Sequence, residues 1–332
     1  MEKIRWGILG CGKIANKFAS DLKLVENAVL TGIASRDAIK GPAFQRDHQV
    51  PKLYGTYEAL ASSPEIDVIY VATPHGFHFV NTMLCLEHGK AVLCEKAFGL
   101  NTLQVREMVR MAKARNVFLM EAFWTKFLPQ FDRVVGLIKS GEIGEIRLIQ
   151  ADFGFSAPEP LAQRLFDPEL GGGSLLDIGI YPVFLAQTLL GKPVEIQAMM
   201  SAYPTGVDEQ CAVTMKFANG ALAVLSSTFA ADTPVEAMIA GTRGRIHMRN
   251  RFHNSIGTIE IARGKDKPEP VEVFRENGYG YQFEARHVGD CLRKGLIESP
   301  VMSHNDSITL METLDEIRRR CGIRYDPYDQ LM

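Results

Sequence analysis

A short apolar run, residues 4–9, leads into three small residues whose spacing suits the binding of a dinucleotide: Gly10, Gly12 and Ala15. Gly10 permits a tight turn with positive φ, and Gly12 lacks the Cβ atom that would keep a pyrophosphate away from the backbone. Ala15 is small enough for close packing of a strand against a helix, and free N–H groups at the helix start would face an anion. Because the pattern directly follows a predicted strand, it indicates dinucleotide binding.

Lys96 is the first candidate for acid–base chemistry. It follows a predicted buried strand, residues 91–94, and so lies at the carboxyl edge of the sheet, where doubly wound folds bind ligands. Hydride transfer between a carbinol carbon and nicotinamide requires a proton to leave or join the oxygen, so a group with a tunable pKa must sit beside the cofactor. Glu95 could fix either the lysine or the backbone turn. Considered alone, a lysine at this position is more often a solvated loop residue.

Asp177 and Tyr181 are four residues apart. This spacing places both on one helix face if the segment 174–190 is helical through Tyr181, although Pro182 could instead start a new helical piece. As plain structure, Asp177 would be a capping residue and Tyr181 a half-buried aromatic side chain. The spacing alone leaves the catalytic and the structural interpretation open.

Two histidines and two aromatic residues are candidates for the substrate side. His75 and His78 lie in the loop after the predicted strand 66–72, near the expected position of nicotinamide, and a capping or surface role is the alternative for each. Trp124 is expected to line the substrate pocket because it lies at the junction of two predicted domains. Phe153, in the next strand, is a further candidate, although core packing explains most aromatic residues.

The first part of the sequence alternates strand and helix patterns, as a parallel sheet requires. Predicted strands cover residues 4–9, 29–35, a short segment near Leu53, 66–72, 91–94 and 118–121, and predicted helices cover 41–48, 79–88 and 102–114, the last capped by Asn101. Six strands with crossovers form a complete doubly wound sheet. Residues 1–122 are therefore expected to form an NAD(P)-binding Rossmann domain of the α/β class.

Residues 123–332 are expected to form a substrate-binding and oligomerisation domain of α+β type, built on a large, mostly antiparallel open sheet. Asn219-Gly220 is a strong hairpin signal between strands 212–218 and 221–229. Further strands are predicted at 145–155, 235–240, 245–248, 258–262 and 271–274, and helices at 283–294 and 307–321, the second capped by Asp306. The two hairpin strands carry apolar or small residues on both faces, which predicts a homodimer that covers the second face.

The composition favours small molecules as ligands. The 332 residues include 37 basic and 39 acidic side chains without a run of like charge, so nothing favours a nucleic acid or an anionic membrane as a partner. The sequence shows no signal-like segment and no apolar run near about 20 residues, which predicts a cytoplasmic protein. The six cysteines lack C-x-x-C spacing and histidines at ligand spacing, so reduced thiols and no metal are expected.

The glycine-rich pattern is one of four motifs in the chain: residues 10–15 (GCGKIA), 72–75 (ATPH), 94–96 (CEK) and 171–181 (GGGSLLDIGIY). Together they resemble the glucose-fructose oxidoreductase / inositol dehydrogenase / MocA family of NAD(P)-dependent oxidoreductases. Residues 119–127 (LMEAFWTKF), Tyr181 and residues 284–288 (EARHV) are most similar to its dimeric dihydrodiol dehydrogenase branch. One departure is Ala97, where the family usually has proline after its Glu-Lys pair.

The resemblance implies an enzyme that moves hydride between NADP, or NAD, and a CH–OH group of a sugar-like or cyclic vicinal diol substrate. It implies catalytic roles for Lys96, Asp177 and Tyr181, with Tyr181 or Lys96 as the proton donor. It implies substrate contacts from His78, Trp124, Phe153 and Asp177. The cofactor-binding residues that it implies are Gly10, Gly12, Lys13, Ile14, Ser35, Arg36, Thr73, Pro74, His75, Glu95 and Lys96.

The end of the second strand bears on the choice of cofactor. Folds that prefer NAD place an acidic residue there to accept a hydrogen bond from the ribose 2′-OH. This chain has Ser35-Arg36, which suits a 2′-phosphate and predicts NADP. Asp37 follows and could still turn toward a ribose, which leaves NAD possible.

Two other functions are compatible with this fold: a cofactor-binding sensor without turnover, and a redox-assisted lyase or glycosidase with tightly bound NAD. The fold alone does not separate them from a dehydrogenase. The joint presence of Lys96, Asp177 and Tyr181 favours an enzyme, because a sensor would be free to lose them.

Overall fold

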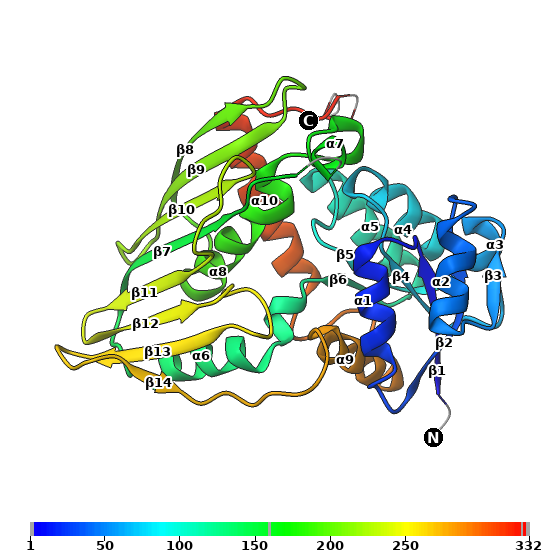
Figure 1. Ribbon diagram of the computed structural model, residues 1–332, viewed down its shortest axis with the longest axis horizontal. Helices are drawn as coiled ribbons and strands as arrows, with labels where there is room; N and C mark the ends of the chain where they lie inside the picture. The colour runs from blue at the N-terminus through cyan, green and yellow to red at the C-terminus, as the bar shows by residue number, and fades with distance from the viewer. Residues whose placement is uncertain (1–2, 159–160, 327, 330–332) are drawn as a thin grey trace. The chain divides into compact units, whose positions relative to one another are not determined.

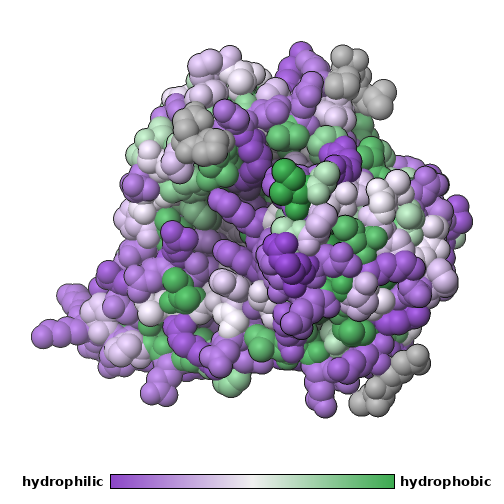
Figure 2. Space-filling view, turned by 45° about the vertical axis from the view of Figure 1, so that its right-hand side comes forward, coloured by the Kyte–Doolittle hydropathy of each residue, from purple (hydrophilic) through white to green (hydrophobic). Residues whose placement is uncertain are grey.

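The computed structural model describes residues 3–158, 161–326 and 328–329. The chain forms two compact units, each built from two stretches of sequence. The first unit comprises residues 1–127 and 276–308, and the second comprises residues 128–275 and 309–332. On the face seen in Figure 2, hydrophilic residues are interspersed with apolar ones, as the balanced composition suggests.

The first unit contains a six-stranded parallel sheet with the order β3-β2-β1-β4-β5-β6, which confirms the predicted doubly wound arrangement. Its strands are β1 (Ile4–Leu9), β2 (Ala28–Ala34), β3 (Lys52–Tyr54), β4 (Val68–Val71), β5 (Ala91–Glu95) and β6 (Leu119–Ala122). Figure 1 shows the helices that connect them: α1 (Lys13–Leu22), α2 (Lys40–His48), α3 (Tyr57–Ala61), α4 (His78–Glu87) and α5 (Thr102–Arg115). Asn101 caps α5 as predicted, whereas the five-residue α3 is too short to show a helical period in the sequence.

Residues 276–308 belong to the first unit, although the sequence analysis places them with the second domain. Helix α9 (Tyr281–Arg293) packs against α1. The buried carboxylate of Asp21 on α1 accepts hydrogen bonds of 2.9 Å from the backbone N–H groups of Tyr279, Gly280 and Tyr281 at the start of α9. This long-range helix cap attaches α9 to the nucleotide-binding fold.

The second unit contains an eight-stranded, mostly antiparallel sheet with the order β14-β13-β12-β11-β7-β10-β9-β8. Among the strands that the structure describes there, β7 and β10 are the one parallel pair. The strands are β7 (Ile146–Gly154), β8 (Glu195–Ala202), β9 (Asp208–Lys216), β10 (Leu222–Thr228), β11 (Ala237–Gly241), β12 (Gly244–Arg249), β13 (Thr258–Arg263) and β14 (Glu269–Val271). Strand β8 is missing from the sequence prediction. The predicted hairpin at Asn219-Gly220 joins β9 to β10.

The helices of the second unit include α6 (Pro129–Lys139), α7 (Leu161–Leu165), the π-helix η4 (Leu175–Gly179) and α8 (Ile180–Leu190), and Figure 1 shows α6 and α8 beside the sheet. Helix α10 (His304–Cys321) starts three residues earlier than predicted. Ser303 Oγ accepts a hydrogen bond from the Asp306 N–H, and the Asp306 carboxylate accepts one from the Ser303 N–H. Ser303 is therefore the capping residue, and the prediction that Asp306 caps α10 is wrong by one turn.

One helical stretch, residues 168–190, is long and apolar enough to cross a membrane by length and composition alone. The sequence analysis expects no apolar run near about 20 residues, and Gly171-Gly172-Gly173 lies within this stretch. Within the structure, 72% of its most apolar window is buried. Its elements η4 and α8 pack against β7 and β10, so the stretch is part of the core of the second unit in this structure.

Candidate active site

The turn between β1 and α1 has the geometry of a phosphate cradle. Gly10 has φ +97°, and a Cβ atom there would lie 2.8 Å from the carbonyl oxygen of Ala72. Gly12 is the N-cap of α1, and a Cβ atom there would meet no described heavy atom within 4 Å. No side chain of the described residues caps α1, so the N–H groups of its exposed first residues, Lys13 and Ile14, remain for an anion.

At the end of β2, Arg36 rather than Asp37 is available to a ligand. The exposed Arg36 guanidinium lies over the Phe77 ring, 4.6 Å from its centroid. Asp37 Oδ1 accepts hydrogen bonds of 2.9 Å from the N–H groups of Ile39 and Lys40, and Oδ2 pairs with Lys40 Nζ at 3.1 Å. These hydrogen bonds lower the pKa of Asp37 to about 2.

Ser35 and the loop after β4 complete the predicted nucleotide edge. Ser35 Oγ accepts a hydrogen bond from the Asp37 N–H at 3.2 Å and so helps to shape the turn. Thr73 Oγ1 accepts one from Asn81 Nδ2 at 3.1 Å. Pro74 then leads into the short helix η1 (His75–Phe77), whose His75 is buried. Because parallel strands end at the same edge, these residues and the β1–α1 turn share one edge of the sheet.

The turn that carries Lys96 is held by four buried side chains. Glu95 Oε2 accepts the Lys96 backbone N–H at 3.2 Å, and the Tyr70 hydroxyl donates to Glu95 Oε1. The next carbonyl, that of Ala97, lies 2.7 Å from His78 Nδ1. The Phe98 N–H donates to Glu121 Oε1 at 3.2 Å. Glu95 thus fixes the backbone turn, one of the two roles considered for it, and the Lys96–Ala97 peptide bond is cis.

His78 faces the backbone rather than a substrate. It is 1% exposed, and its Nε2 lies 2.7 Å from the Thr73 carbonyl oxygen while its Nδ1 contacts the Ala97 carbonyl. Burial, the largest effect, lowers the pKa of His78 to about 4, and a neutral ring donates to only one carbonyl at a time. Since both ring nitrogens are occupied, the predicted substrate contact of His78 does not fit this structure. His78 joins the loop after β4 to the Lys96 turn.

Glu121 is a site residue that the sequence analysis missed. In the sequence it lies at the end of the predicted strand 118–121 and within the motif 119–127, where no role was assigned to it. Burial raises the pKa of Glu121 to about 7, whereas the Ser307 side chain and the Phe98 N–H lower it. Its place in that motif is the only signal in the sequence, because nothing local connects Glu121 to residues 96–98.

Trp124 lies within the first unit, in the short helix η2 (Trp124–Phe127). Its ring stacks on Tyr281 with a centroid distance of 4.7 Å and an interplanar angle of 6°, and it is 8% exposed. Its predicted contact with substrate stays a prediction.

Asp177, Tyr181 and Phe153 lie in the second unit. The π-helix η4, which contains Asp177, runs directly into α8, so the segment is helical through Tyr181 as the spacing requires. Asp177 Oδ2 is 3.4 Å from an Arg164 guanidinium nitrogen. π-Helical turns occur frequently at functional sites.

His253 is a second residue that the sequence analysis missed. Its ring stacks on Phe153 at 4.3 Å between centroids and lies 4.7 Å from the Tyr181 ring. Phe153 and Tyr181 are themselves 5.7 Å apart. A lone histidine in the loop after β12 gave no sequence signal, because only the folded sheet brings this loop to β7 and α8.

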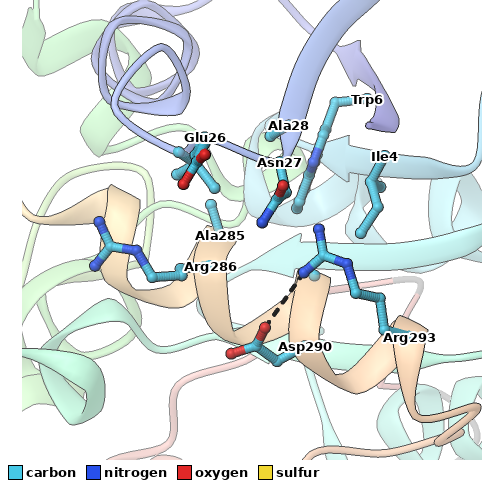
Figure 3. A pocket seen from close by; sticks show the side chains of 11 residues that line it. Ile4, Trp6, Glu26, Asn27, Ala28, Ala285, Arg286, Asp290 and Arg293 are labelled. Carbon is cyan, nitrogen blue, oxygen red and sulfur yellow. Dashed lines mark hydrogen bonds and ion pairs between the residues drawn. The ribbon is translucent and has the colours of Figure 1, made fainter. Parts of the chain in front are cut away.

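A cavity of about 110 Å³ lies elsewhere in the first unit, between α9 and the beginnings of β1 and β2 (Figure 3). Figure 3 shows the Arg293–Asp290 ion pair, 3.3 Å long, at its wall, with Asn27 opposite. The nucleotide edge follows the ends of the same strands, so this cavity is separate from it. All six cysteines are free thiols, and no three His, Cys, Asp or Glu side chains in the described ranges could together hold a metal ion.

Comparison with known proteins identifies the family. Residues 4–123 match the NAD-binding Rossmann fold of the GFO/IDH/MocA oxidoreductase family, and residues 131–247 match the GFO/IDH/MocA C-terminal domain. The chain is 40% identical over 331 residues to a trans-1,2-dihydrobenzene-1,2-diol dehydrogenase from Xenopus tropicalis. The matched region covers 97% of this chain and 99% of that protein. This protein therefore belongs to the GFO/IDH/MocA family of oxidoreductases, as the motifs predicted.

Solved structures agree with this assignment. A 3-ketoreductase from Actinomadura kijaniata in complex with NADP and TDP-benzene is 27% identical, with a TM-score of 0.85 over 96% of this chain and 98% of that chain. An aldose-aldose oxidoreductase from Caulobacter crescentus, 23% identical, shares the fold with a TM-score of 0.88 over 97% and 98% of the two chains. The predicted fold and enzyme class are confirmed.

Proposed function

We propose that this protein is an NADP-dependent dehydrogenase that acts on a secondary alcohol or ketone of a cyclic vicinal diol or a sugar-like ring. The observation that carries the proposal is the turn at Lys96, which buried side chains fix at the same sheet edge as the phosphate cradle of Gly10 and Gly12. The likeness along the full chain to trans-1,2-dihydrobenzene-1,2-diol dehydrogenases supports the diol substrate.

The assignment of NADP is supported by the end of β2. The carboxylate of Asp37 is occupied by the start of α2, so it is not poised to accept a ribose 2′-OH. Arg36 is held over Phe77 with its guanidinium exposed, where it suits a 2′-phosphate.

The proposed chemistry assigns each residue a role. When bound, the nicotinamide supplies or accepts the hydride. Lys96 or Tyr181 exchanges the proton of the reacting alcohol oxygen, and Asp177 orients the neighbouring hydroxyl group. Phe153 and His253 form an aromatic wall beside Tyr181 that suits the apolar face of a ring.

Initial rates on a matched panel test this function. The panel contains a trans-cyclic diol, its cis isomer, a reducing pyranose and an aliphatic mono-alcohol, each with NADP and with NAD. We expect the highest kcat/KM for a cyclic vicinal diol or pyranose with NADP. A mono-alcohol that outperforms every diol and sugar would overturn the substrate class, and a preference for NAD would overturn the cofactor.

We also propose a homodimer formed through the open face of the eight-stranded sheet. Side chains of this face are exposed although several are apolar: Met199 is 73% exposed, Val224 46% and Leu222 42%. Val224 pairs with Thr214 and Gln150 on neighbouring strands, so its side chain shares this face of the sheet with theirs, and a second copy could cover the apolar members. A monomeric mass by light scattering at micromolar concentration would rule out this dimer.

A further inference from the structure

The segment that carries Asp177 and Tyr181 begins at a glycine-rich turn that is anchored from β9. Asp208, at the start of β9, is fully buried, and its Oδ2 accepts hydrogen bonds from Ser174 Oγ at 2.7 Å and from the Leu175 N–H at 2.6 Å. These donors lie two and three residues before Asp177. The carboxylate therefore caps the first turn of η4 from a distant strand.

The fit between this carboxylate and the turn is close. Gly173 has φ +112°, and a Cβ atom there would overlap Asp208 Oδ1. Ser174 Oγ also lies 2.9 Å from Ser227 Oγ on β10, and the Tyr325 hydroxyl donates to the Gly172 carbonyl at 2.6 Å. A glycine at position 173 is thus needed for the close approach of Asp208. The turn is tied to β9, β10 and the C-terminal segment.

Burying an ionised carboxylate at this position costs free energy unless hydrogen bonds compensate for it, so packing alone does not account for Asp208. Burial raises the pKa of Asp208 to about 6, while Ser174 and the Leu175 N–H, and to a lesser degree Arg318, lower it. Oδ1 of Asp208 has no hydrogen-bond partner among the described residues. The other titratable groups that face Asp208 are Cys211 of β9, Cys321 of α10 and Tyr325.

We propose that Asp208 is a positioning residue for the reaction: its carboxylate fixes the start of η4 and thereby the orientation of Asp177 and Tyr181. This inference rests on the proposed function, because it presumes that these two side chains act on the substrate. Ionised Asp208 accepts both hydrogen bonds with full strength, and protonation weakens them. The turn is therefore held most firmly above the pKa of this carboxyl group.

The test compares Asp208→Asn with Asp266→Asn, an exposed aspartate in the turn after β13. Backbone amide exchange followed by mass spectrometry reports on residues 174–181 without needing a substrate. We expect Asp208→Asn to accelerate exchange there and to lower kcat by roughly 10- to 100-fold, because small displacements of reacting groups are costly. The affinity for NADPH, measured by fluorescence, should stay unchanged, since the cofactor cradle lies in the first unit.

A pH profile adds a readout that a purely structural role would not move. In the parent protein kcat should fall as the pH drops below about 6. In Asp208→Asn this decline should be absent over the same range. Ser174→Ala, which removes only one donor, is the second variant if Asp208→Asn does not fold, and it should accelerate exchange and lower kcat to a smaller extent.

The outcomes separate the two proposals. Unchanged exchange at residues 174–181 in both variants would overturn the inference whatever the activity. Faster exchange with unchanged kcat would overturn the positioning role and leave the proposed function standing. A parent protein inactive on every diol and sugar would instead overturn the proposed function, and with it the role of Asp208 in catalysis.

Discussion

Replacing Arg36 by alanine should reduce the preference for NADP over NAD without weakening the fold. Arg36 is exposed at the end of β2, and its guanidinium lies 4.6 Å from the Phe77 ring centroid and 5.6 Å from that of Tyr57. These rings hold the cation in place before a cofactor arrives. The interaction that Arg36→Ala removes is therefore chiefly the one with a 2′-phosphate.

The binding free energy that Arg36→Ala removes depends on how far solvent screens the Arg36 guanidinium. A hydrogen bond to a charged partner contributes about 1.5–3 kcal/mol, and solvent screening at an exposed site favours the lower half of that range. A loss of about 1.5–2 kcal/mol corresponds to a roughly 10- to 30-fold rise in KM for NADP, with KM for NAD unchanged. Steady-state kinetics with both cofactors measure this ratio. Arg46→Ala, which removes an exposed arginine of α2, is the control.

A companion variant tests the competing role of Asp37. The Asp37 carboxylate already accepts hydrogen bonds from the backbone N–H groups of Ile39 and Lys40. Asp37→Ala should therefore loosen this turn locally but alter KM for either cofactor by less than about threefold. If Arg36→Ala leaves the cofactor ratio unchanged while Asp37→Ala abolishes activity with NAD, the reasoning about the end of β2 is refuted.

Three further predictions concern stability and assembly. Asp21→Ala leaves the buried N–H groups of Gly280 and Tyr281 and the part-buried N–H of Tyr279 without their acceptor, so urea denaturation should show a loss of about 3–5 kcal/mol in the free energy of unfolding, and a loss below about 1 kcal/mol would contradict the cap. The pKa of Glu121 is raised to about 7 in the folded state, so its stabilising effect is present at low pH and is lost as the pH rises through 7. Glu121→Gln should therefore gain stability relative to the parent between about pH 5 and 7, on the order of 3 kcal/mol, and a constant difference across this range would be inconsistent with a buried titrating acid. Val224→Lys places like charges on the exposed sheet face and should yield a folded monomer by light scattering, whereas an unchanged dimer would locate the interface elsewhere.

Local sequence patterns were sufficient for much of the fold. Each parallel strand is a short apolar run bounded by turn residues, so the six strands of the Rossmann sheet are found within about two residues of their predicted bounds. Gly10 and Asn101 act as predicted because positive φ and helix capping are properties of single residues. The predicted cap of α10 is wrong because serine and aspartate are both favoured N-cap residues, and only the folded chain shows that Asp306 is the N3 partner of Ser303.

Local sequence patterns do not predict the long-range contacts that shape the candidate site. His78 is the first residue of α4 rather than a loop residue, and the direction of its ring depends on two carbonyl groups that follow separate strands. Glu121 and Asp208 each hold a turn far away in the chain, and neither has a neighbour in sequence that reveals this. Burial and long-range hydrogen bonding are properties of the folded chain, so a sequence without its fold does not show them.

Turnover of Lys96→Met tests the central claim most directly. The structure fixes the backbone on both sides of Lys96 with buried side chains, which is the preorganisation that a proton-transfer group requires. On the best diol or sugar of the panel, kcat should fall by roughly 10²-fold or more, with much less change in the affinity for NADPH. Lys139→Met, at the exposed end of α6, should retain parental kinetics. Near-normal turnover of Lys96→Met on every active substrate would contradict the account.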